Sequence, residues 1–187
     1  MRIEPTSIEG VLIVQNEIYS DQRGAFQEWF PGERFKEATG IDFKPQQANS
    51  SFSKKGVIRG IHYSTSISGQ AKLVTCMGGE ILDVVFDIRK DSKTFGKHVS
   101  VPMRAQDGKS VYIAEGLGHA FISLVENSNL VYLLSSSYSP EDEHAVNPFD
   151  TTLNFKWPLE NVILSDRDAT APTLQYQIDA NNLPRMY

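Results

Sequence analysis

The chain has 187 residues, of which 40% are hydrophobic and 22% are charged, a composition typical of a soluble domain. Its 18 Lys and Arg residues are outnumbered by 23 Asp and Glu residues, which gives a formal net charge of -5 and a pI near 5.4. General nucleic-acid binders need a broad excess of basic residues, so this balance excludes that class, and an anionic ligand would need a local basic pocket.

Short segments rich in Val, Ile, Phe or Tyr run through the chain, separated by 9 prolines and 13 glycines. Such segments predict strands. In chain order the predicted strands are Gly10–Tyr19, Ala25–Phe30, Val57–His62, Lys72–Thr75, Glu80–Ile88, His98–Pro102, Ser110–Ala114, Ala120–Val125 and Leu130–Ser135. A short helix is predicted over Glu33–Thr39, with Gly40 suited to its C-terminal end, and a second helix near Gln175–Asn182.

This pattern favours an all-β fold. Helices are too few for βαβ units, and the sequence contains neither a GxGxxG motif nor a P-loop. Evenly spaced strands of this number predict a double-sheet jelly roll with an interior that can hold a ligand. The length lies within the range that one core serves and no linker divides the chain, so residues 1–187 are expected to form one domain.

The single cysteine, Cys76, excludes an internal disulfide and a paired-thiol zinc site. The N-terminal segment mixes charges and Pro with short apolar stretches, unlike a signal peptide or a membrane-spanning helix. We therefore expect a cytoplasmic protein with no membrane role and no nucleic-acid partner.

The four histidines show no local metal-binding motif. His62, His98, His119 and His144 are well separated, and none forms an HxH or HExxH pair. No metal is therefore predicted. A metal-dependent cupin isomerase or dioxygenase would require His62, His98 and either His119 or His144 to converge on one ion.

Several polar residues are unremarkable when each is taken alone. His62, with Arg59 three residues before it, is typical of a partly buried strand histidine. Lys72 at a strand start is typical of a solvated lysine, and Tyr132 in an apolar strand of a core tyrosine. Asp168 lies in a polar segment typical of a surface turn. Only their combination points to chemistry.

That combination resembles the dTDP-4-dehydrorhamnose 3,5-epimerase family, and within it an actinobacterial-type subgroup. The similarity covers residues 5–175, nearly the whole chain. The motifs that carry it, in order, are Asp21–Glu28, Gln47–Ser51, Gly56–Tyr63, Gly69–Lys72, Asp87–Arg89, Thr94–Gly96, Glu115–Phe121, Tyr132–Pro140, Glu143–His144, Trp157–Pro158 and Leu164–Ala169.

The resemblance implies a fold, a substrate and an assembly. It implies a cupin-type jelly roll, also called a double-stranded β-helix, that works as a homodimer with no metal and no redox cofactor. The implied substrate is a dTDP-4-keto-6-deoxy sugar, inverted at C3 and C5 to give the L-rhamnose precursor. Because jelly rolls host many unrelated activities, the site must support this inference independently.

Epimerisation next to a ketone needs three groups. A base removes the hydrogen at C3 or C5, a donor or cation stabilises the oxyanion at C4, and an acid returns a proton from the opposite face of the ring. By similarity to the family, His62 is the base, oriented by Asp168, and Tyr132 is the proton donor on the far face. Lys72 supplies a compact positive charge for the oxyanion.

The resemblance also implies the substrate-binding residues. Guanidinium groups suit the diphosphate, and three arginines match these positions: Arg23, Arg59 and Arg167. Aromatic faces suit the base, and polar side chains suit the nucleotide and sugar. The matching residues are Phe26, Tyr138, Glu28, Gln47, Asn49, His119 and Glu143, with Ser51 a weaker candidate.

Two departures leave the regiochemistry open. Leu133 stands where many relatives carry Lys, which would add charge near the site, and the stretch Leu134–Ser137 is less bulky than in rhamnose-pathway members. A mono-epimerase acting at C3 or C5 only, in an antibiotic or cell-surface deoxysugar pathway, is therefore an alternative. A second alternative is a non-catalytic sugar-nucleotide-binding cupin, in which His62 need not face Tyr132 across a pocket.

Overall fold

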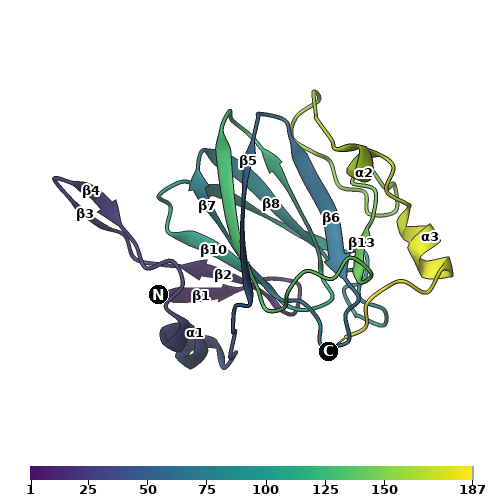
Figure 1. The fold of residues 1–187 in the computed structure, drawn as a ribbon, viewed down its shortest axis with the longest axis horizontal. Coiled ribbons are helices and arrows are strands. Elements are labelled where there is room, and N and C mark those ends of the chain that lie inside the picture. The colour runs from purple at the N-terminus through teal and green to yellow at the C-terminus, as the bar shows by residue number, and fades with distance from the viewer. Residues whose placement is uncertain (187) are drawn as a thin grey trace.

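Two facing β-sheets form the body of the computed structural model, which describes residues 1–186 (Figure 1). The larger sheet has six strands in the order β1-β2-β10-β7-β12-β5, all paired antiparallel. Its strands are β1 (Arg2–Pro5), β2 (Val11–Gln15), β5 (Gln47–Ser53), β7 (Lys72–Gly78), β10 (Lys109–Ile113) and β12 (Ser128–Leu134).

The second sheet has five antiparallel strands in the order β13-β6-β11-β8-β9. Its strands are β6 (Ile58–Ser64), β8 (Glu80–Phe86), β9 (His98–Arg104), β11 (Gly118–Ser123) and β13 (Glu143–Ala145). Neighbours in each sheet are mostly distant in sequence, because the chain crosses repeatedly between the two sheets. This arrangement confirms the predicted cupin-type jelly roll.

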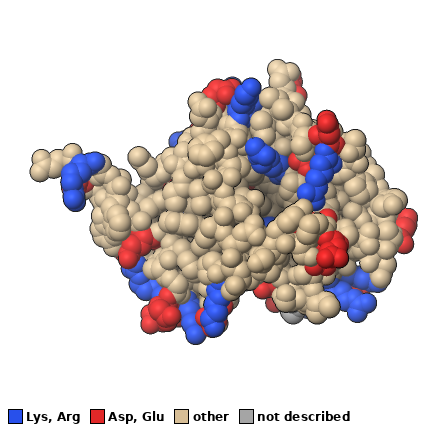
Figure 2. Space-filling view, in the orientation of Figure 1, with Lys and Arg blue, Asp and Glu red and all other residues tan. Residues whose placement is uncertain are grey.

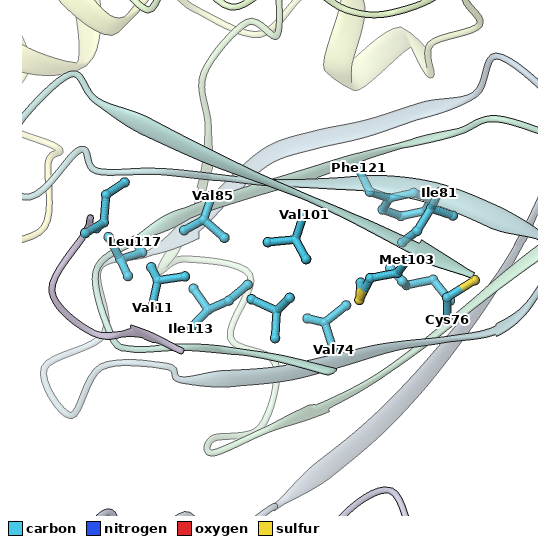
Figure 3. Close-up of a cluster of buried hydrophobic side chains, with 13 residues drawn as sticks. Val11, Val74, Cys76, Ile81, Val85, Val101, Met103, Ile113, Leu117 and Phe121 are labelled. Carbon is cyan, nitrogen blue, oxygen red and sulfur yellow. The ribbon is translucent and has the colours of Figure 1, made fainter. Parts of the chain in front are cut away.

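The space between the sheets is filled by a core of aliphatic side chains. Val74 of the larger sheet points toward Val85 and Val101 of the smaller one (Figure 3). On β9, Val101 and Met103 are buried while the residues on either side of each are exposed, the period-two pattern that the sequence shows. Each such buried side chain contributes about 1.5–3 kcal/mol of hydrophobic stabilisation.

Both sheets are also covered on their outer faces. On the larger sheet, α1 (Gly32–Thr39) packs Phe35 against Tyr112 with ring centroids 5.5 Å apart. On the smaller sheet, Leu153 and Leu174 pack against Tyr63. The segment that supplies them contains α2 (Asp166–Ala169) and α3 (Leu174–Asp179) (Figure 1). This second cover carries part of the site.

A two-stranded hairpin, β3 (Tyr19–Asp21) and β4 (Gly24–Phe26), projects from the body of the protein (Figure 1). The predicted strand Ala25–Phe30 therefore extends only to Phe26, and the predicted strand Gly10–Tyr19 is interrupted after Gln15. There the backbone N–H of Asn16 donates to the carbonyl of Gly108 at 2.8 Å.

The predicted helix Glu33–Thr39 is confirmed as α1, and Gly40 ends it with a positive φ of 75°. α3 overlaps the region predicted for the second helix, although it begins at Leu174 and ends at Asp179. Three strands were not predicted: β1, β5 and β13. β5 has the polar sequence QANSSFS at a sheet edge, so its strand conformation comes from pairing with β12 over its whole length.

The longest helix within residues 1–186 is α1, with eight residues, far fewer than a membrane crossing needs.

Gly60 sets the approach of β6 to β11, the two strands that carry His62 and His119. A Cβ at Gly60 would lie 2.5 Å from both the carbonyl oxygen of His119 and the Cβ of Ala120, and Gly60 has φ +123°. Gly24 has nearly the same φ, +125°, but a Cβ there would meet nothing within 4 Å. Substitutions at these two glycines therefore distinguish the cost of an unfavourable φ, which both share, from the cost of steric overlap, which only Gly60 has.

We expect Gly60→Ala to lower the free energy of unfolding by about 1–3 kcal/mol more than Gly24→Ala, because only the first substitution forces two strands apart. Urea unfolding of the two variants and the wild type measures this difference. Equal losses in both variants would show that the close approach of the strands is not what requires glycine.

Candidate active site

A cavity of about 280 Å³ opens between the two sheets, next to β5 and β6. Figure 2 shows Lys and Arg side chains around a hollow on this face of the molecule. The cavity is lined from both sheets and from the start of α2, by Ser50, Ser51, Arg59, His62, His119, Phe121, Leu130, Tyr132, Ser165, Arg167 and Asp168. Phe121 and Leu130 also belong to the core, so the cavity floor is apolar while its walls are polar.

His62 on β6 forms a hydrogen bond from Nε2 to Oδ1 of Asp168 at 2.6 Å. Asp168 is buried, and its Oδ2 also accepts a bond from the backbone N–H of Gly60 at 3.5 Å. Ser165 caps α2 by accepting the backbone N–H of Asp168 at 3.1 Å. With Nε2–H directed at the carboxylate, Nδ1 of His62 is left to accept a proton.

Two opposing effects act on the Asp168 carboxyl. Burial by itself would raise its pKa, but the hydrogen bond from His62, the charge of His62 and the bond to Ser165 together hold the pKa below its ordinary value. The carboxylate is therefore ionised at neutral pH and can stabilise a positive charge on the imidazole. The segment lies at the surface, as a short helix and not a turn, but Asp168 is its buried residue, so the interpretation is wrong for Asp168.

A second histidine–carboxylate pair lies on the same sheet. Nε2 of His119 on β11 bonds to Oδ1 of Asp83 on β8 at 2.6 Å, and both side chains are buried. His119 is the register partner of His62, so the two imidazoles lie side by side on one face of the sheet. Sequence reasoning missed Asp83. Its signal was an acidic residue at a core position within the apolar strand Glu80–Phe86.

Tyr132 lines the cavity from the opposite sheet. It lies on β12, packs partly against the core, and is the register partner of Asn49 on β5. His62 and Tyr132 therefore occupy opposite walls of one cavity. A non-catalytic sugar-nucleotide-binding cupin would not require this arrangement of His62 and Tyr132.

Lys72 is buried. The interpretation of Lys72 as a solvated lysine at a strand start is therefore wrong. It lies on the same sheet face as Tyr132, two residues before Val74, the register partner of Tyr132. Its side chain is outside the set that lines the cavity. Burial lowers the pKa of Lys72 to about 8, and the nearby charge of Glu143 on β13 limits the decrease.

Of the other predicted binding residues, Arg59, Arg167 and Ser51 line the cavity, whereas Gln47, Asn49 and Tyr138 contact one another outside its lining. Gln47 donates from Nε2 to Oδ1 of Asn49 at 2.9 Å, and its Oε1 accepts the backbone N–H of Tyr138 at 2.9 Å. Arg59 lines the cavity, and its Nε donates to the hydroxyl of Ser53 at 3.2 Å. Arg167 and Ser51 also line it, and the buried hydroxyl of Ser51 has no partner within residues 1–186.

A sequence model of the family described as dTDP-4-dehydrorhamnose 3,5-epimerase matches residues 5–176. The chain belongs to this family. It is 49% identical over 173 residues to a dTDP-4-dehydro-6-deoxyglucose 3-epimerase from Streptomyces bikiniensis, covering 92% of this chain and 88% of that one. It is 44% identical over 185 residues to a dTDP-4-dehydrorhamnose 3,5-epimerase from Mycolicibacterium smegmatis, covering 98% and 91% of the two chains.

A solved structure extends the similarity to the fold of this epimerase family. The dTDP-6-deoxy-D-glucose-3,5-epimerase RmlC from Legionella pneumophila, in complex with dTDP-4-keto-L-rhamnose, superposes with a TM-score of 0.93 at 39% identity. The similarity covers 100% of this chain and 98% of that chain.

Three predicted binding residues of this family member do not reach the cavity of their own chain. Arg23 lies at the exposed hairpin, where it forms an ion pair with Asp21 at 2.5 Å. Phe26 ends the hairpin and is 64% exposed. Glu28 follows it and pairs with Arg34. Within this chain, none of the three lines the cavity.

Leu133 does not lie where the sequence comparison implied. Because side chains alternate along β12, Leu133 points to the opposite face from Tyr132, where it packs with Phe35 and Tyr112 beneath α1. A Lys at this position would project away from the cavity. The expectation that it would add charge near the site is wrong.

The four histidines do not converge. His98 packs against Phe155 with ring centroids 4.9 Å apart, and His144 bonds to the hydroxyl of Thr65 at 3.0 Å. Within residues 1–186 no group of three His, Cys, Asp or Glu side chains is placed to hold a metal ion. The arrangement that a metal-dependent cupin would need is therefore not found in the described part of the chain.

We expect Asp168→Asn to change the tautomer of His62. An amide N–H in place of the carboxylate would donate to Nε2 and move the imidazole proton to Nδ1, the atom needed as a base. Nitrogen-15 chemical shifts of His62 in the folded protein report the tautomer directly. Asp166→Asn, an exposed change on the same helix, is the control and should leave the shifts unchanged. An unaltered tautomer in Asp168→Asn would contradict the assigned hydrogen bond.

Proposed function

We propose that the chain epimerises dTDP-4-dehydro-6-deoxy-D-glucose at C3 and C5 to give dTDP-4-dehydro-L-rhamnose. The observation that carries this proposal is the placement of the His62–Asp168 pair and of Tyr132 on opposite walls of one cavity. Epimerisation requires a base and an acid on opposite faces of a ring, and a cavity of this kind supplies both. Family membership and the named relatives support the same reaction.

The first step is removal of a proton next to the C4 ketone. Nδ1 of His62 accepts the hydrogen from C3 or C5, and the electron pair of the broken C–H bond forms an enolate. Asp168 stabilises the imidazolium that results. Tyr132 then donates its hydroxyl proton to the same carbon from the opposite face, which inverts the centre. Proton exchange with solvent through the open cavity restores both side chains.

The enolate places negative charge on the C4 oxygen. We assign its stabilisation to Lys72, whose side chain is buried in a low-dielectric region on the same sheet face as Tyr132. Attraction between charges is stronger in such a region than in water. A buried cation of fixed position also needs little reorganisation as the oxyanion forms.

Binding of the dTDP group is assigned to the cavity arginines and the polar edge of β5. Arg59 and Arg167 suit the diphosphate because guanidinium groups pair with phosphate oxygens. Further contacts to nucleotide and sugar are assigned to Gln47, Asn49, Tyr138, Glu143 and His119. This local basic wall lets a chain with a net charge of -5 bind an anionic substrate.

A mono-epimerase acting at C3 is the second candidate. It is favoured by the 49% identity to a relative named dTDP-4-dehydro-6-deoxyglucose 3-epimerase. The two reactions share the base, the acid and the oxyanion, and differ only in which ring carbons reach His62. The cavity residues named above serve either reaction.

We propose further that the chain works as a homodimer in the cytoplasm. The projecting hairpin exposes 51% of Tyr19 and 64% of Phe26, and Phe52 on the edge strand β5 is 74% exposed. Aromatic rings exposed to this extent are typical of contact surfaces. A second copy would cover them and would bring Arg23, Phe26 and Glu28 to the cavity of its partner.

Proton NMR in deuterium oxide with dTDP-4-dehydro-6-deoxy-D-glucose tests the reaction. We expect the wild type to incorporate deuterium at C3 and C5, and His62→Ala to incorporate none, because the base is gone. Tyr132→Phe should still exchange through His62 but without inversion, since no acid remains on the far face. Exchange at C3 alone would select the mono-epimerase, and no exchange in the wild type would refute both reactions.

Mixing two inactive variants tests the shared site. If the hairpin of one copy reaches the other copy's cavity, Arg23→Ala and His62→Ala subunits together form one intact site in each mixed dimer. Random mixing should then restore roughly a quarter of wild-type sites. A mixture of Arg23→Ala and Arg104→Ala, which changes an exposed residue on β9, is the positive control. No recovery in the first mixture would place Arg23 outside the partner's site.

A further inference from the structure

A buried ammonium group needs compensation, and the structure shows how Lys72 obtains it. Lys72 is 6% exposed, and its Nζ donates to Oε1 of Gln70 at 2.8 Å. An ammonium group removed from water without hydrogen bonds or an opposite charge is strongly destabilised. The residues around Nζ therefore decide both its position and its charge.

Gln70 bridges Lys72 to a carboxylate. The Gln70 side chain is 5% exposed, and its Nε2 donates to Oε1 of Glu143 at 3.2 Å while its Oε1 faces the ammonium group. The amide is thus oriented at both ends, with its acceptor toward the cation and its donor toward the anion. A side chain held in this way has little freedom to rotate.

This chain of three residues connects the two sheets. Lys72 begins β7 in the larger sheet, and Glu143 begins β13 in the smaller sheet. Ala145, two residues after Glu143, is the register partner of His62. The contact therefore ties the strand of the proposed oxyanion cation to the strand beside the proposed base.

We propose that Gln70 is a positioning residue that fixes the Lys72 ammonium group for the C4 oxyanion, and that Glu143 acts through Gln70 to keep that group charged. This inference rests on the proposed function, in which Lys72 stabilises the oxyanion. The family resemblance assigned no role to Gln70, and it assigned Glu143 only to substrate contact.

The electrostatics agree with this geometry. Burial lowers the pKa of Lys72 to about 8, and the charge of Glu143 opposes the decrease. The register neighbours of Lys72 are Leu134 on β12 and Ile113 on β10, neither of which carries a charge. Glu143 on β13 is therefore the charged group that acts on Lys72 from the elements packed around it. Loss of its influence lowers the pKa further, toward neutrality.

The first test is the pH dependence of kcat. Activity needs protonated Lys72, so it falls as pH rises through the pKa of that group. In Gln70→Met, which keeps the length of the side chain but removes both hydrogen bonds, we expect kcat to fall roughly ten- to hundredfold. We expect the alkaline fall in activity to move to lower pH by on the order of one unit. Glu143→Gln removes the charge alone and should move it in the same direction.

Gln177→Met is the matched control. Gln177 is also buried, and its Nε2 donates to the carbonyl of Ala145 at 2.9 Å. Its replacement should lower the melting temperature without moving the pH profile. If Gln70→Met and Gln177→Met lose stability but leave the alkaline limb in place, Gln70 has only a structural role and the inference is wrong.

A double-mutant cycle with Lys72→Met supplies the second test. If Gln70 acts through the ammonium group, Gln70→Met should change kcat by less than twofold in the Lys72→Met background, although it is costly in the wild type. Additive losses would contradict the inference. Deuterium exchange by the wild type distinguishes failure of the proposed reaction from failure of the role of Gln70. Absence of exchange would refute the proposed reaction. Exchange together with additive losses of kcat would refute only the role of Gln70.

Discussion

The hydrogen bond between His62 and Asp168 joins residues 106 positions apart in the sequence, and the site depends on it. β13 pairs with β6 along residues 62–64, two backbone bonds between Ile61 and Val146 continue this contact, and the chain around Ile163 bridges to Val57 just before β6. The chain that follows Ile163 forms α2 and brings Asp168 to Nε2 of His62. Without the outer cover of the smaller sheet, His62 would have neither a defined tautomer nor a fixed orientation.

Buried charge recurs in and around this cavity, although only Asp168 of the three residues concerned lines it. Asp83, Asp168 and Lys72 are all removed from solvent, and each has a hydrogen-bonding partner. Removing such groups from water costs several kcal/mol each, so their retention is not explained by stability. The proposed proton transfer and oxyanion stabilisation would explain the retention of Asp168 and Lys72, because both work best where partners are fixed and water is excluded.

The proposed acid–base groups and the proposed hairpin contacts have different structural settings. The proposed base, acid and cation come from two packed sheets, where neighbouring strands hold side chains rigidly. The hairpin, in contrast, pairs its two strands with each other, and its charged and aromatic residues lie outside the cavity lining. In the proposed homodimer, the chemistry would therefore lie in the core of each chain, and the hairpin contacts would come from its partner.

Much of this could be predicted from the sequence. Alternating apolar residues such as those of β9 determine a strand with one buried face, and Gly40 determines the end of α1, because both effects act between near neighbours. The ordered motifs that contain His62, Lys72 and Tyr132 were sufficient to indicate the family.

Only the tertiary structure decided which polar residues are buried. Asp168 and Lys72 have the local sequence of exposed residues, β5 has the composition of a loop, and Asp83 differs from its apolar strand neighbours without any indication of its partner. Their environments come from strands and segments far away along the chain, and pairing over such distances leaves no signal in the residues immediately around them.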